Sequence, residues 1–75
     1  MTQKQKDNTI RYLKCAKLQG GGQSIWIIAN RINAWNDEVS KYLQSLKRKG
    51  LITYIPTTKV WFWIKEVELD EIIKL

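Results

Sequence analysis

The residues with the most informative chemistry lie between Asn36 and Lys49, where polar and basic side chains are interspersed among apolar ones. In an α-helix, which turns by about 100° per residue, Lys41, Gln44 and Arg48 share one face. Glutamine can form paired hydrogen bonds with adenine and arginine with guanine, whereas lysine binds phosphate as a point charge. If this helix enters the major groove of DNA, Gln44 and Arg48 are the candidates for reading bases. The candidate DNA contacts on this helix are Asn36, Ser40, Lys41, Gln44, Ser45, Lys47 and Arg48.

Two carboxylates, Asp37 and Glu38, begin the same segment and allow two interpretations. They stabilise the positive N-terminal end of the helix, each by about 0.3–1 kcal/mol. Alternatively, a carboxylate accepts a hydrogen bond from cytosine, and its repulsion of phosphates penalises non-specific binding. An exposed polar face is also what any solvated helix presents, so the rest of the chain must decide whether this face binds a partner.

The charge of the chain favours a polyanionic partner. Residues 1–65 contain 12 Lys and Arg against 3 Asp and Glu, and residues 66–75 contain 1 against 4, so a +9 body precedes a −3 tail. A positively charged surface attracts nucleic acid or an anionic membrane. Lysines that only keep a small protein soluble would give the same composition, so charge alone does not decide between these uses.

Several classes of function are excluded by residues that the chain lacks. Cys15 is the only cysteine and there is no histidine, so we expect no intrachain disulfide, no metal site and no cofactor. No acidic pair is placed against a nucleophile, so we expect no enzyme and no small-molecule substrate. There is no leader-like or membrane-spanning apolar run, so we expect a cytoplasmic protein without membrane contact.

Three helices are expected before residue 51, within a single domain that spans residues 1–75. The first follows a flexible arm (residues 1–7), is capped by Asp7 or Asn8 and ends at the three glycines 20–22. The second runs from the Ser24 cap to about Asn33, and we expect neighbours to cover its Trp26 and Ile27. The third is capped by Asn36 and stopped by Gly50, and buries an apolar stripe: Val39, Leu43 and Leu46.

After Gly50 the apolar period changes from helical to alternating, which predicts a β-hairpin over residues 51–55 and 60–65 around a 56–59 turn. We expect Val60, Phe62 and Ile64 to face the core, although Trp61 and Trp63 on the opposite face leave that choice open. Tyr54, Trp61 and Trp63 are expected to pack inside, with stacking on single-stranded bases as the alternative. Residues 66–75 form an acidic tail or a short helix with Leu69, Ile72 and Ile73 on one face.

Helix, helix, helix and hairpin is the order of a winged helix-turn-helix, and two motifs in this chain resemble that family. The first is similar to the family's positioning helix: Ser24, Ile25, Ile28, Ala29 and Ile32. The second is similar to its recognition helix running into the first strand: Val39, Ser40, Leu43, Leu46, Gly50, Leu51 and Ile52. The size and composition also resemble small, thermostable regulators encoded by viruses and plasmids of thermophilic archaea.

The resemblance implies an α+β fold and a sequence-specific regulator of transcription that binds double-stranded DNA. Residues 36–49 would enter the major groove, and a wing at about 55–60 would contact the backbone through Thr57, Thr58 and Lys59, with Arg11 and Arg31 as further phosphate contacts. The chain lacks the family's long C-terminal dimerisation helix, so we expect a monomer or weak homodimer, with pairing on DNA as an option. The alternative function is a protein-interaction module that docks through the aromatic hairpin and acidic tail.

Overall fold

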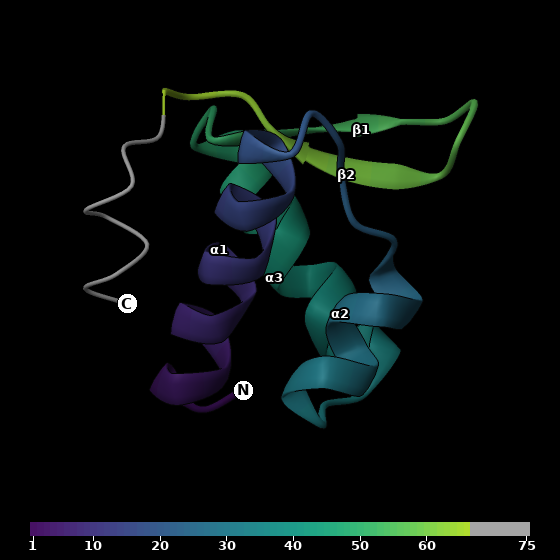
Figure 1. The fold of residues 1–75 in the computed structure, drawn as a ribbon. Helices are drawn as coiled ribbons and strands as arrows, with labels where there is room; N and C mark the ends of the chain where they lie inside the picture. The colour runs from purple at the N-terminus through teal and green to yellow at the C-terminus, as the bar shows by residue number, and fades with distance from the viewer. Residues whose placement is uncertain (67–75) are drawn as a thin grey trace.

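The computed structural model describes residues 1–66 and contains three helices followed by one hairpin. The helices are α1 (Gln3–Leu18), α2 (Ile25–Ile32) and α3 (Asn36–Arg48), and the strands are β1 (Ile52–Ile55) and β2 (Val60–Trp63). The hairpin lies across one end of the helical layer (Figure 1). This order confirms the α+β prediction and is compatible with a winged-helix layout.

No helix in residues 1–66 is long and apolar enough to cross a membrane. The predicted tail helix lies outside the described residues.

Helix α1 begins earlier than expected, because a capping box fixes its first turn. Thr2 Oγ1 accepts a 3.1 Å hydrogen bond from the Gln5 backbone N–H, and the Gln5 side chain accepts one of 2.8 Å from the Thr2 N–H. These bonds satisfy backbone donors that a helix end otherwise leaves unpaired. The prediction of a flexible arm over residues 1–7, with a cap at Asp7 or Asn8, was therefore wrong. The helix ends as predicted at the glycines, where Gly20 has a φ of 80°.

The ends of α2 follow the prediction, but its outer face does not. Ser24 caps the helix by accepting a hydrogen bond from the Ile27 N–H, and Asn33 ends it in the left-handed conformation. Trp26 and Ile27, which were expected to be covered, are 73% and 46% exposed. On a helical wheel both residues lie away from the apolar stripe that packs inward, so one buried face is enough to hold this helix.

The centre of the core is the apolar stripe of α3. Val39, Leu43 and Leu46 are buried as predicted, and Gly50 follows the helix with a φ of 75°. Asn36 does not cap the helix. It is the first helical residue, and Trp35 occupies the cap position without a side-chain hydrogen bond. Asp37 and Glu38 lie in the first turn, where their charge stabilises the helix end in place of a cap.

The hairpin buries its tryptophans, and the expectation that Val60, Phe62 and Ile64 would close the core was wrong. The strands are antiparallel, with Ile52 opposite Trp63 and Tyr54 opposite Trp61. Trp61 and Trp63 are each 5% exposed, whereas Ile64 is 47% exposed. An indole removes more apolar surface from water than Val or Ile, so the face with the tryptophans is the one that packs on the helices.

The glycine-rich connection between α1 and α2 is joined to the hairpin by backbone pairing. The Gln23 N–H donates to the Trp61 carbonyl at 2.9 Å, and the Trp61 N–H donates to the Gln23 carbonyl at 2.7 Å. Gly22 makes this approach possible, because a Cβ at that position would lie 2.7 Å from the Trp61 carbonyl oxygen. The pairing ties the start of α2 to β2.

Gly22→Ala is expected to lower the free energy of unfolding by about 1–3 kcal/mol, because the added methyl group forces the Gln23–Trp61 pairing apart. Gly21→Ala is the matched control. Its Cβ would be 4.0 Å from the nearest atom, so we expect a neutral to stabilising change of at most about 1 kcal/mol. Urea unfolding measures both variants, and equal effects would contradict this role of Gly22.

Candidate nucleic-acid interface

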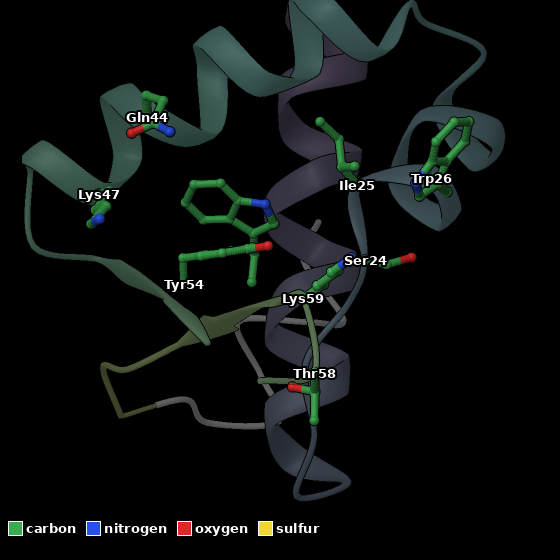
Figure 2. Close-up of a pocket in the computed structure, with 9 residues that line it drawn as sticks. Ser24, Ile25, Trp26, Gln44, Lys47, Tyr54, Thr58 and Lys59 are labelled. Atoms are coloured by element: carbon green, nitrogen blue, oxygen red, sulfur yellow. The ribbon is translucent and has the colours of Figure 1, made fainter. Parts of the chain in front are cut away.

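A cleft of about 410 Å³ lies between the start of α2, the second half of α3 and the hairpin turn. Figure 2 shows side chains from all three segments around it. The Gln23–Trp61 pairing brings the α2 end and the hairpin together, and α3 packs against both α2 and β1. The residues lining the cleft are Ser24, Ile25, Trp26, Gln44, Lys47, Tyr54, Thr58, Lys59 and Trp61.

Helix α3 contributes Gln44 and Lys47 to this cleft, and both side chains are exposed. Val39, Leu43 and Leu46 hold one side of the helix in the core, and Gln44 and Lys47 lie outside that stripe. The hairpin turn contributes Thr58 and Lys59, which are also exposed. An amide, a hydroxyl and two ammonium groups are therefore offered to one ligand, a set suited to base edges and phosphates.

The electrostatics of the cleft favour an anion. Its lining within the described residues contains Lys47 and Lys59 and no carboxylate. Ser24 places the N-terminal end of α2 at the cleft, and the positive end of a helix dipole adds to the attraction. The acidic pair of α3 lies elsewhere: Asp37 lines a hollow beside Trp35, and Glu38 lines another with Lys41 and Tyr42. The pair therefore does not line this cleft.

No protein-family model matches the chain, and no curated protein or solved structure is detectably similar to it. The function must therefore be inferred from the geometry of the chain itself.

The other predicted contacts on α3 do not line the cleft. Lys41 and Arg48 are both exposed, and Lys41 lines the hollow that also contains Glu38 and Tyr42. Asn36 and Ser40 are half-buried, and Asn36 lines the hollow at Trp35. Ser45 Oγ donates a 2.8 Å hydrogen bond to the Tyr42 carbonyl oxygen, so its hydroxyl retains only the capacity to accept.

The remaining predicted phosphate contacts are spread over other elements. Thr57 is exposed in the hairpin turn beside the cleft residue Thr58. Arg11 is exposed on α1. The Arg31 guanidinium lies over the Tyr12 ring of α1, 5.2 Å from its centre, and Arg31 does not line the cleft. The structure thus brings together four of the predicted residues in the cleft: Gln44, Lys47, Thr58 and Lys59.

One edge of α3 faces the N-terminal part of α1 rather than the cleft. Burial of the Tyr42 side chain, with a smaller contribution from the Asp7 carboxylate, raises the pKa of its phenol. The Lys6 ammonium lies 5.7 Å from the centre of the Tyr42 ring, a cation–π distance. Tyr42 therefore stays neutral at physiological pH and holds α1 against α3.

Sequence reasoning missed the contribution of α2 to the cleft. Ser24 was identified only as a cap, and Trp26 was assigned to an interior contact. A signal was available, because Trp26 lies about 110° around the helix from the centre of the apolar stripe. What could not be read from spacing was the Gln23–Trp61 pairing, which turns this end of α2 toward the hairpin.

Proposed function

We propose that this protein is a winged-helix regulator of transcription that binds double-stranded DNA in a sequence-specific manner. The observation that carries the proposal is the cleft, in which the polar side of α3, the positive end of α2 and the hairpin turn converge and to which residues 1–66 contribute no carboxylate. Helix α3 would lie in the major groove and the turn at residues 56–59 on the phosphate backbone. The +9 charge of residues 1–65 supports a polyanionic partner.

The roles of individual side chains follow from their chemistry and exposure. Gln44 and Arg48 read base edges, since both are exposed. The glutamine amide can donate one hydrogen bond to adenine and accept another from it, and the arginine guanidinium can donate two to guanine. Lys41, Lys47 and Lys59 neutralise phosphates, where a point charge suffices. The burial of Trp61 and Trp63 leaves the hairpin without an exposed indole, which disfavours the alternative of a partner protein docking on an aromatic hairpin.

Selection of binding sites from a pool of random duplexes, followed by affinity measurements with variants, tests the proposal. Gln44→Ala is expected to cost about 1–3 kcal/mol on the selected site and to relax the preference at one base pair. Lys47→Ala, the matched control one helical turn away, is expected to weaken binding to all duplexes alike.

Failure of the pool to converge on any sequence would contradict sequence-specific binding. An equal loss of affinity for selected and random duplexes in Gln44→Ala would show that Gln44 does not read bases. Both measurements require only the wild-type chain and exposed substitutions, which leave the core unchanged.

A further inference from the structure

The most unusual side chain of the cleft is Trp26, whose indole is 73% exposed in the first turn of α2. Burying a large apolar side chain lowers the free energy. An indole left in solvent beside a candidate binding surface therefore indicates a contact with a ligand that the free chain does not make. Trp26 lies at the α2 edge of the cleft, across from Gln44 and Lys47 (Figure 2). Tyr54 and Trp61 already pack on each other with ring centres 5.0 Å apart, so among the described lining residues Trp26 is the aromatic side chain with an exposed ring.

The residues around Trp26 indicate the chemical class of ligand that would cover its indole. Lys47 and Lys59 favour an anionic ligand, the Gln44 amide offers paired hydrogen bonds, and the indole offers a flat apolar surface. A nucleotide has all three complementary parts: a phosphate, a base edge and a base face. In a paired duplex the base faces are covered by stacking, so the indole reaches a base face without the cost of separating stacked pairs where a base is unpaired.

We propose that Trp26 is a stacking platform for an unpaired base, so that the cleft binds duplex DNA containing an extrahelical base more tightly than a fully paired duplex. The base stacks on the indole, Gln44 contacts its edge, and Lys47 and Lys59 hold the flanking phosphates. This inference rests on the proposed DNA-binding function and specifies the kind of DNA that the cleft prefers.

Fluorescence anisotropy with three labelled duplexes of one sequence tests the proposal: fully paired, with a single bulged thymidine, and with an abasic bulge. The abasic bulge has the same backbone distortion but no base to stack. Wild-type protein is expected to bind the thymidine bulge most tightly, and Trp26→Ala to bind it about 5- to 150-fold more weakly than wild type. Trp26→Phe, which keeps an aromatic ring, is expected to restore most of the preference.

Trp35→Ala is the matched control, because Trp35 is 79% exposed and lies outside the cleft lining. It is expected to leave the ratio of bulged to paired affinity unchanged. Circular dichroism of both variants verifies that these exposed substitutions leave the fold intact.

Equal binding of the three duplexes, or an equal loss on all three in Trp26→Ala, overturns the inference while leaving the proposed function standing. The equal loss would assign Trp26 to sugar contacts or to insertion between paired bases. Binding of the thymidine bulge alone supports the inference and overturns binding of paired DNA. Binding of none of the three overturns both.

Discussion

Raising the salt concentration from about 50 to about 200 mM is expected to weaken binding of a random duplex by about 500-fold. The exposed cations of α3, of its C-cap and of the hairpin turn are Lys41, Lys47, Arg48, Lys49 and Lys59. If these neutralise about five phosphates, the logarithm of affinity falls with the logarithm of salt at a slope near −4.5, because each neutralised phosphate releases counterions. Filter binding or anisotropy over this range measures the slope.

Single lysine substitutions locate the source of the salt dependence. Lys59→Ala is expected to reduce the magnitude of the slope by about 0.9, the contribution of one phosphate. Lys4→Ala is the matched control, since Lys4 is an exposed lysine on α1, distant in sequence from the cleft residues. Binding of no duplex, or binding that salt does not change, would contradict the DNA interface and favour a protein partner.

Trp61→Ala is expected to lower the free energy of unfolding by about 3–5 kcal/mol. The side chain is 5% exposed and packs in the main core, so its removal loses apolar burial and leaves a cavity. A folded domain is stable by about 0.05–0.15 kcal/mol per residue, so the loss is a large part of the total for a 75-residue chain. Urea unfolding followed by far-ultraviolet circular dichroism measures it without using tryptophan fluorescence.

Two further variants keep the Trp61 experiment decisive if Trp61→Ala does not fold. Trp61→Phe retains a ring in the core and is expected to lose less stability than Trp61→Ala. Trp35→Ala removes an indole that is 79% exposed, so we expect a change within about 0.5 kcal/mol. Similar losses of unfolding free energy for Trp61→Ala and Trp35→Ala would show that burial of Trp61 does not stabilise the core.

The elements that could be predicted from the sequence are those where polar and apolar residues separate cleanly. The α3 stripe of Val39, Leu43 and Leu46 is such a case, and its three residues are buried as expected. Spacing alone determines which face of a helix is buried when the opposite face is charged. The same logic correctly placed Ser24 as the cap of α2.

The face of β2 was mispredicted because both of its faces are apolar. Alternation identifies a buried face only when the other face is polar, and here Phe62 competes with Trp61 and Trp63. The start of α1 was mispredicted for a different reason, because Thr2 and Gln5 form a capping box in a segment without apolar periodicity. The spacing of Thr2 and Gln5 was a readable signal, but only for a search directed at caps rather than at cores.

The residues that α3 contributes to the candidate site could be predicted from the sequence. The way in which α2, α3 and the hairpin come together could not. Helical geometry placed Gln44 and Lys47 on one exposed side, and the hairpin turn supplied Thr58 and Lys59. The inclusion of Trp26 depends on a contact between chain segments that no local pattern specifies.

The backbone pairing between Gln23 and Trp61 also affects how the proposed complex would form. It holds the start of α2 and the hairpin in one orientation before any ligand arrives, so little conformational entropy is lost on association. If the protein surface keeps its shape on binding, the DNA must deform to fit it. Duplexes of different sequence differ by several kcal/mol in the cost of bending or of widening a groove. Flexible base-pair steps that no side chain touches would then contribute to the choice of binding site.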